Sequence, residues 1–356
     1  MTTGFGILGA GMISSLHADA LKNSPKARLV AVCDRVRERA EKLVREYAPE
    51  AKVYSDLDAL LADPAVEVVS VVTPNALHTD AVVAAAAAGK HVLCEKPPAM
   101  SLADTDRMID ACRQAHRKLG VFVQCRLREP IRQMKRALDE GRFGRLLRVD
   151  AAMKWYRSAD YYRSDAWRSD RRSGAGVTIQ HAFHYIDLLS YLAGPAESVH
   201  ARMANLGHPD IPIEDTVDAM IEFANGAIGS VAASTALWPG TDVRIEVFGD
   251  EGTAIMQGTA MAVWKFREER PEDESIRRCG DAAVATAAGS ATALPSVDHQ
   301  MVIDDCVDAI QCGREPAIPC HSVRPALEIA LAMYRSARLG EPVRLPLVDE
   351  NRVWED

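Results

Sequence analysis

The sequence has no long apolar run, no excess of positive charge and no closely spaced cysteine pair. No window approaches the ~18 consecutive apolar residues of a membrane-spanning helix, so we expect no transmembrane segment. The formal net charge is -8, which disfavours non-specific binding to nucleic acid. No basic stripe with interleaved aromatic residues offers a nucleic-acid surface. We therefore expect neither a nucleic-acid nor a membrane partner.

The eight cysteines are scattered, and most lie in apolar segments. This pattern is typical of buried, reduced thiols in a reducing compartment. No charged segment, apolar stretch or cleavage site precedes the first expected strand, so we expect a cytoplasmic protein. At 356 residues, with 48% hydrophobic and 26% charged content, the chain can form two domains with substantial cores.

The run from Gly6 to Ser14 has the pattern of a buried strand, a glycine-rich turn and the start of a helix. Such a turn points backbone N–H groups and a helix N-terminus at a pyrophosphate. Gly9 permits the tight turn, and Gly11 lets the backbone approach a ligand. An ordinary strand-to-helix turn is the alternative. On the dinucleotide interpretation, the cofactor-binding residues of the turn are Gly9, Ala10, Gly11, Met12 and Ile13.

The second expected strand ends in Asp34, about 25 residues beyond Gly9 and near the ~20-residue spacing of a carboxylate that binds the adenosine ribose. A carboxylate accepts hydrogen bonds from both ribose hydroxyls and repels a 2′-phosphate, which favours NAD over NADP. Arg35 follows directly and could bind a 2′-phosphate. A helix N-cap is the structural alternative for Asp34.

Residues 1–124 alternate expected strands and helices, and continuous apolar runs such as Val68–Val72 suit parallel strands buried on both faces. This predicts an α/β fold with an N-terminal doubly wound parallel sheet of the Rossmann type. Residues 125–356 instead alternate apolar and polar residues in long strands. They predict a C-terminal α+β domain with a large, mostly antiparallel open sheet.

Within the second domain we expect one helix at 176–193, closing helices at 300–313 and 323–339, and a surface loop at 268–298. One face of the open sheet should be covered by the helices. The other should be an oligomer interface. The apolar residues expected on that second face are Ile221, Ala227, Ile228 and Val231.

Two strand ends of the first domain have polar motifs. Thr73-Pro74-Asn75, with His78 beyond it, and Glu95-Lys96-Pro97 both follow buried strands. The carboxyl edge of a doubly wound sheet is where its ligand binds. The prolines after Lys96 restrict the backbone, and a cis peptide can form before Pro97. We expect Lys96 to donate to a substrate oxygen near the cofactor, or to pair with Glu95 on the surface.

The segment from Gly174 to Asp187 leads into the expected helix 176–193. Gln180, His184 and Asp187 are spaced by four and three residues and would share one helix face. Histidine as a residue type suits proton transfer near neutrality, which makes His184 a candidate acid or base, and Asp187 could orient its imidazole. A metal pair of His181 and His184 lacks an evident third ligand, so we predict no metal site.

With these motifs together, the chain resembles the glucose–fructose oxidoreductase / inositol dehydrogenase (Gfo/Idh/MocA) family over nearly its full length. The resemblance implies that Lys96 and His184 flank the nicotinamide and handle the proton. It also implies that Thr73, Asn75, His78 and Glu95 line the nicotinamide and ribose. Many members have Asp at the position of Gln180. An amide cannot act as a base there, although it can bind a hydroxyl.

The stretch from Tyr156 to Arg168 resembles the family segment that covers the cofactor and shapes the sugar site. Its arginines predict an anionic substrate group, or alternatively pair with neighbouring aspartates on a solvated loop. The residues assigned to the site by this reasoning fall into three groups. The catalytic residues are Lys96, His184, Asp187 and Gln180. Beyond the glycine turn, the cofactor-binding residues are Asp34, Arg35, Thr73, Pro74, Asn75, His78, Glu95, Lys96, Pro97, Gln124, Trp167 and Arg168. The substrate-binding residues are Lys96, Arg126, Tyr156, Arg157, Tyr162, Gln180 and His184.

These residues predict a nicotinamide-dependent oxidoreductase that moves a hydride between the cofactor, NAD rather than NADP, and a ring hydroxyl of a sugar or cyclitol. Two alternatives remain open. One is an NAD-dependent glycoside hydrolase that uses transient oxidation, and the other is a non-catalytic NAD-binding sensor. The family resemblance also implies a homodimer or homotetramer.

Overall fold

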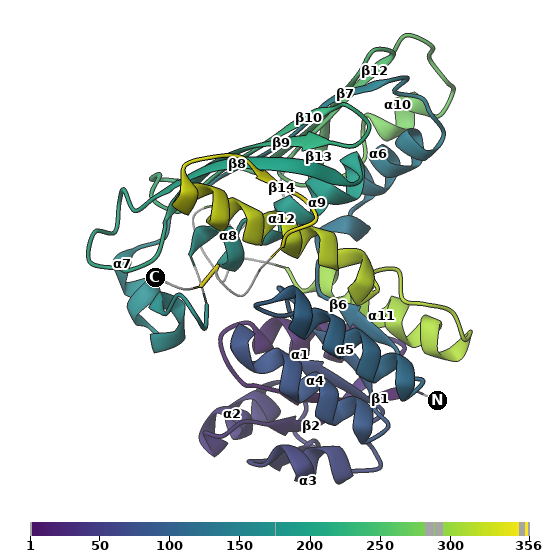
Figure 1. Cartoon of the computed structure of the whole chain (residues 1–356). Helices are drawn as coiled ribbons and strands as arrows, with labels where there is room; N and C mark the ends of the chain where they lie inside the picture. Colours follow the sequence, from purple (N-terminus) through teal and green to yellow (C-terminus); the bar gives the residue numbers. More distant parts are fainter. Residues whose placement is uncertain (1, 175, 282–287, 289–294, 349–352, 355–356) are drawn as a thin grey trace. The chain divides into compact units, whose positions relative to one another are not determined.

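A computed structural model describes residues 2–174, 176–281, 288, 295–348 and 353–354 (Figure 1). Contacts divide the chain into two units. The N-terminal unit is Met1–Gln124 with Pro295–Arg324, and the C-terminal unit is Cys125–Leu294 with Pro325–Asp356. The segment 295–324 thus belongs to the N-terminal unit, whereas the sequence boundary assigned it to the C-terminal domain.

The N-terminal unit contains a six-stranded parallel sheet in the order β3-β2-β1-β4-β5-β6. Residues of β1 and β4 are buried along their whole length, as the continuous apolar runs predicted. The strand order reverses between β1 and β4, and a doubly wound sheet binds its ligand at such a switch point. The strands are β1 Thr3–Leu8, β2 Ala27–Cys33, β3 Lys52–Tyr54, β4 Val68–Val71, β5 His91–Cys94 and β6 Leu119–Val121.

Helices pack on both faces of this sheet. α1 and α2 contact β2, while α4 contacts β4, β5 and α5. Right-handed crossovers place these two groups on opposite faces. The helices are α1 Ser14–Asn23, α2 Arg37–Tyr47, α3 Leu57–Ala62, α4 His78–Ala87 and α5 Leu102–Gln114, with a 3-10 turn η1 at Asn75–Leu77.

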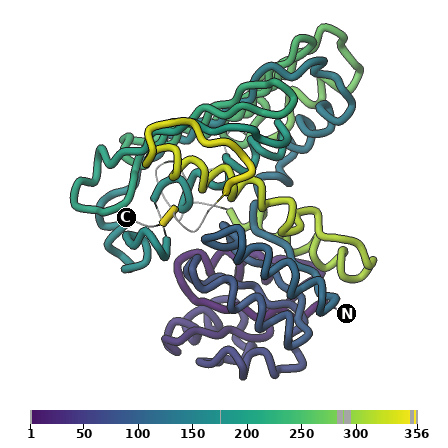
Figure 2. The backbone as a smooth tube through the Cα atoms, viewed as in Figure 1, coloured from purple at the N-terminus to yellow at the C-terminus, as the bar shows by residue number. Residues whose placement is uncertain are grey.

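The returning segment adds α11, Val297–Gln311, which packs along α1 (Figure 2). Polar pairs fix it there: the Ser24 hydroxyl donates to Asp304, and Lys26 Nζ lies 2.7 Å from both carboxylate oxygens of Asp308. α12, Cys320–Leu339, begins at the end of the same segment and continues into the C-terminal unit.

The C-terminal unit is built on an eight-stranded sheet in the order β13-β12-β11-β7-β10-β9-β8-β14. Among the strand pairs of the described residues in this sheet, only β7–β10 is parallel, so the mostly antiparallel sheet is confirmed. The strands are β7 Leu146–Lys154, β8 Ala196–Ala204, β9 Thr216–Phe223, β10 Ile228–Ser234, β11 Arg244–Gly249, β12 Gly252–Gln257, β13 Ala260–Phe266 and β14 Val343–Arg344.

The helices α6, α8 and α9 lie over one face of the sheet, and α9 packs against β7, β10 and β11 (Figure 1). Ile221, Ala227 and Val231 are buried beneath this layer, so the expectation that they lie on an open face was wrong. Of the four residues expected there, only Ile228 is exposed, at 43%. Ala227 and Ile228 are adjacent in the sequence, so their side chains point to opposite faces of the sheet, and the expectation was wrong to place both on one face.

The remaining helices are short except for α6, α9 and α12. The helix expected at 176–193 is divided into α8, Val177–Gln180, and α9, Phe183–Ala193, because His181 leaves the helical conformation with φ of -126°. The expected loop at 268–298 contains α10, and much of it lies outside the described residues. Over the described ranges, no helix has the length and apolarity to cross a bilayer. The other elements are η2 Gln124–Leu127, α6 Glu129–Asp139, α7 Ala159–Arg163, η3 Ala166–Ser169 and α10 Asp273–Ile276.

Candidate functional site

The glycine turn between β1 and α1 has the geometry that a dinucleotide needs. Gly9 adopts φ of 101°, and a Cβ there would lie 2.6 Å from the carbonyl oxygen of Val72, so only glycine fits. A Cβ on Gly11 would meet no atom within 4 Å, which leaves the backbone open to a ligand. The Ser14 hydroxyl donates to the carbonyl of Gly11 at 2.6 Å and closes the turn against α1.

Asp34 ties this turn to the end of β2. One carboxylate oxygen accepts the N–H of Ala10 at 2.7 Å, and the other accepts the N–H of Val36 at 2.8 Å. Each oxygen has a further acceptor position, so the carboxylate is fixed in place and can still bind ribose hydroxyls. Arg35 is exposed beside it.

Two further residues of the N-terminal unit have polar atoms without partners. Thr73 follows β4, and Gln124 begins η2. Among the described residues, Thr73 Oγ1 and Gln124 Oε1 are buried atoms with no hydrogen-bond partner. Unmade hydrogen bonds of this kind are costly and often mark a ligand site. Together with the open space at Gly11, they fit a nicotinamide dinucleotide bound at this sheet edge.

His78 was expected to line the nicotinamide and ribose, but its side chain is buried between two loops. Its fully buried ring lies between two carbonyl oxygens, with Nδ1 2.9 Å from Pro97 O and Nε2 2.9 Å from Thr73 O. Burial lowers the pKa of His78, although these carbonyls favour the protonated ring. The ring therefore joins the loop after β4 to the loop after β5, and its contribution to the site is to position them.

The segment after β5 contains a cis peptide between Lys96 and Pro97, which the sequence allowed. Lys96 is partly exposed, whereas Glu95 is 8% exposed and points into the unit. One Glu95 oxygen lies 2.8 Å from Nε2 of His17, and the other accepts the N–H of Lys96 at 3.0 Å. Burial alone would raise the pKa of Glu95, but its interactions with His17 and His299 hold it well below its usual value. Glu95 thus supports the Lys96 backbone from inside.

In the C-terminal unit, Asp187 and Arg126 form a buried two-point ion pair. Arg126 Nε and Nη2 lie 2.7 and 2.6 Å from the two carboxylate oxygens. The side chains are 0% and 4% exposed for Asp187 and Arg126, and the guanidinium also lies 4.6 Å from the Tyr191 ring centroid. From the sequence, we expected Asp187 to orient the His184 imidazole and Arg126 to bind the substrate. In the structure, Asp187 and Arg126 instead pair with each other.

His184 lies in the first turn of α9. It is the one side chain of the described stretch 181–190 that is not buried. Gln180 lies before the helix break, and its amide donates to the carbonyl of Arg168 at 2.6 Å. The break removes the single helix face that the sequence predicted for Gln180, His184 and Asp187.

The segment after β7 forms a layer of aromatic rings and guanidinium groups. Arg168 stacks on Tyr161 and Trp167 with centroid distances of 4.6 and 4.7 Å, and Arg157 lies 5.1 Å from the Trp155 ring. Burial lowers the pKa of Arg157. Tyr162 differs from its expected substrate role, because it is 1% exposed and its hydroxyl lies 2.6 Å from Thr235 Oγ1.

Two neighbouring residues of this segment, Tyr156 and Arg163, differ in their exposure and contacts. Tyr156 is partly buried and pairs with Ala236 in an isolated bridge. Arg163 is exposed and lies 4.0 Å from Asp160 and 3.8 Å from Asp210, as expected for a solvated loop. The arginines of this segment therefore divide into a buried, stacked pair and an exposed remainder.

Comparison with known proteins agrees with this geometry. Residues 3–123 match the model described as "Oxidoreductase family, NAD-binding Rossmann fold", and residues 131–255 match the "GFO/IDH/MocA C-terminal domain". The chain belongs to the Gfo/Idh/MocA oxidoreductase family. The resemblance stated from the sequence motifs is confirmed, and so is an NAD-binding N-terminal domain.

Among members of this Gfo/Idh/MocA family, myo-inositol 2-dehydrogenase of Thermotoga maritima is 33% identical over 69% of this chain and 73% of its own. Levoglucosan dehydrogenase of Pseudarthrobacter phenanthrenivorans is 30% identical over 78% and 77%. The WlbA dehydrogenase of Bordetella pertussis, solved with NADH and UDP-GlcNAcA, superposes with a TM-score of 0.85. It is 31% identical to this chain and the match covers 98% of this chain and 100% of that one.

Sequence reasoning missed His17 and His299, which contact or approach Glu95. His17 could have been found from its position on α1, three residues after Ser14 and on the same helix face. His299 is distant in sequence and had no local signal.

Proposed function

We propose that the protein is an NAD-dependent dehydrogenase that oxidises a ring hydroxyl of a sugar or cyclitol. The observation that supports this most directly is the position of Lys96. This partly exposed lysine follows the carboxyl end of β5, in the same unit as the glycine turn. Its backbone N–H donates a hydrogen bond to the carboxylate of Glu95. The related dehydrogenases of inositol and levoglucosan support the same substrate class.

Lys96 would donate a hydrogen bond to the reacting oxygen and stabilise charge that develops there. His184 would take the hydroxyl proton in oxidation and return it in reduction. A bound nicotinamide supplies the hydride acceptor. The turn residues Gly9–Ile13, with Asp34, Thr73 and Gln124, would bind and orient the dinucleotide.

Gln180 and the stacked layer of Arg157, Arg168 and Trp167 would define the substrate side. Aromatic faces suit sugar C–H surfaces, and guanidinium groups suit carboxylate or phosphate. A substrate with an anionic substituent is a second candidate, favoured by the UDP-GlcNAcA complex of the Bordetella relative.

The test is a substrate panel with NAD or NADP, read as the absorbance of reduced nicotinamide. The panel contains myo-inositol, scyllo-inositol, levoglucosan, simple aldoses and UDP-GlcNAcA. We expect NAD reduction with at least one neutral polyol or the sugar nucleotide. Glycoside cleavage without net reduction would instead support the hydrolase alternative. Binding of NAD with neither reaction would support a sensor.

We also propose a cytoplasmic homodimer or homotetramer. All eight cysteines are free thiols, and six of them are buried, which suits a reducing compartment. The sheet face opposite the helices has exposed apolar side chains at Met220, Ile228 and Val263. Such a face suits a symmetric contact with a second copy.

A further inference from the structure

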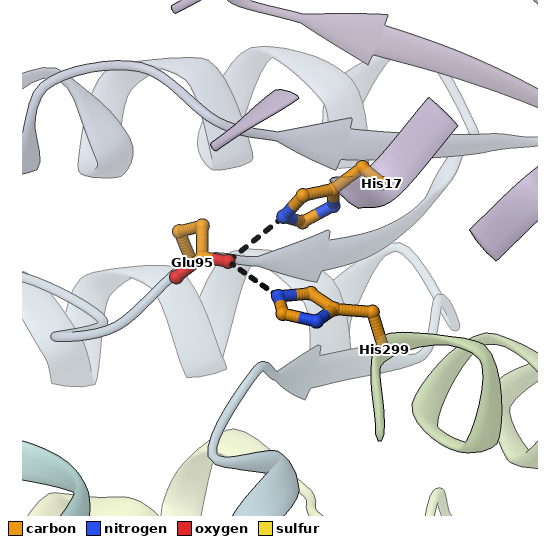
Figure 3. A group of neighbouring side chains, drawn as sticks. All are labelled: His17, Glu95 and His299. Atoms are coloured by element: carbon orange, nitrogen blue, oxygen red, sulfur yellow. Dashed lines mark hydrogen bonds and ion pairs between the residues drawn. The ribbon is translucent and has the colours of Figure 1, made fainter. Parts of the chain in front are cut away.

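Three side chains from distant parts of the sequence meet inside the N-terminal unit. His17 comes from α1, Glu95 from the end of β5 and His299 from α11 (Figure 3). One potential ligand atom of each lies within 4.8 Å of the others. Their side chains are 0%, 10% and 2% exposed. This cluster is outside the residues assigned to substrate and dinucleotide, apart from Glu95.

His299 is the member of the cluster that the fold does not explain. Both of its buried ring nitrogens lack a hydrogen-bond partner among the described residues. Its Nε2 lies 3.8 Å from Glu95 Oε1, too far for a hydrogen bond. Phe122 and His17 pack against the ring with centroid distances of 5.6 and 5.0 Å. Buried polar atoms are usually hydrogen-bonded, so the two ring nitrogens of His299 can accommodate a further ligand beside the contact with Glu95.

We propose that His17, Glu95 and His299 form a binding site for a divalent transition metal of the Zn²⁺ type. Imidazole nitrogen with a carboxylate oxygen is a common ligand set for such ions. Donor atoms about 2.1 Å from a tetrahedral ion lie about 3.4 Å apart. The distances here are 2.8 Å from His17 to Glu95 and 3.8 Å from His299 to Glu95, which bracket that spacing.

The surroundings supply an outer hydrogen bond of the kind that metal ligands use. His17 Nδ1 lies 3.0 Å from the Ser70 hydroxyl. When His17 binds a metal through Nε2, Nδ1 is protonated and donates to Ser70, which fixes the ring orientation. The second Glu95 oxygen remains on the N–H of Lys96. A bound ion would therefore brace α1, α11 and the segment that precedes Lys96.

The test is thermal unfolding of the full chain, first dialysed against a chelator and then titrated with Zn²⁺. A ligand that binds only the folded state raises the melting temperature as its concentration passes Kd. We expect a rise for the wild type and none for His299→Leu. His321→Ala, which changes an exposed histidine of the same unit, should respond as the wild type does.

Two further measurements keep the proposal testable if His299→Leu does not fold. Ser70→Ala should weaken Zn²⁺ binding by about 10–100-fold, the usual effect of losing an outer hydrogen bond. Co²⁺ bound to the wild type should give the visible absorption bands of a tetrahedral site, and Zn²⁺ should displace them. An unchanged wild-type melting temperature without Co²⁺ bands would overturn the proposal, as would equal Zn²⁺ responses in the wild type and His299→Leu.

Discussion

Arg126 holds Asp187 by two hydrogen bonds, one to each carboxylate oxygen, at 2.7 and 2.6 Å. The pair is buried, and burial raises the pKa of Asp187 even though Arg126 opposes that shift. A buried ion pair contributes little net stability, but removing one partner leaves an uncompensated charge. The ion pair with Arg126 therefore gives Asp187 a structural role in the core of the C-terminal unit.

Asp187→Asn should therefore lower the free energy of unfolding by about 3–5 kcal/mol, because the Arg126 guanidinium stays buried without its anion. Urea unfolding measures this. The double variant Arg126→Met with Asp187→Leu removes both charges and should recover most of the loss. A shift in the pH profile of kcat with unchanged stability would return Asp187 to the role of orienting His184.

Lys96→Ala and His184→Ala should each reduce kcat by about 10²–10⁴-fold, the usual effect of losing a positioned acid or base. NAD affinity, measured by fluorescence titration, should change only a few-fold. His200→Ala, an exposed histidine on β8, is the matched control for His184. Near-wild-type kcat in Lys96→Ala would remove this lysine from the mechanism.

Asp34→Ser should raise the use of NADP relative to NAD, because it removes the negative charge that repels a 2′-phosphate. It also removes the acceptor for the Ala10 N–H, so NAD affinity should fall as well. The ratio of kcat/KM for the two cofactors measures the change. Arg35→Ala is the companion variant. A wild type that already prefers NADP would show that Arg35 dominates.

Asp273 should make the C-terminal unit sensitive to acid. Its carboxylate receives hydrogen bonds from Arg142, Trp264 and the N–H of Arg270, with Arg142 first, and its pKa lies far below the ordinary value. A depressed folded-state pKa stabilises the fold above the unfolded value of ~3.9, and this stability is lost as the pH falls below it.

Asp273→Asn should consequently cost about 3–5 kcal/mol at neutral pH, because the buried Arg142 loses its anion. The difference from the wild type should shrink below pH ~4. Chemical unfolding at a series of pH values measures both. Asp160→Asn, in an exposed pair, should stay within ~0.5 kcal/mol throughout. A pH-independent difference would show that packing accounts for the loss.

Replacing Met220 and Ile228 together by Lys should weaken self-association, because both are exposed on the sheet face opposite the helices. Light scattering at micromolar concentration should show an oligomer for the wild type and a smaller species for the variant. Val263→Ala is a milder control on the same sheet. A monomeric wild type would remove the proposal of a homo-oligomer.

The sequence alone determined the fold class and the chemistry at the ends of strands. Continuous apolar runs identified the parallel strands, and the glycine turn, Asp34 and the Glu95-Lys96-Pro97 segment were recognised because each is a local pattern. Such patterns can be recognised in a sequence because residues a few positions apart determine the backbone conformation that each pattern requires. The Gfo/Idh/MocA resemblance rested on the same short segments.

Only the tertiary structure decided which side chains meet. The pairing of Arg126 with Asp187 joins residues far apart in sequence, and His299 reaches Glu95 because α11 returns to the N-terminal unit. The two faces of the sheet could not be assigned from alternation, since period-two patterns do not say which side the helices cover. The structure also interrupts the 176–193 helix at His181, where local spacing had predicted one continuous face.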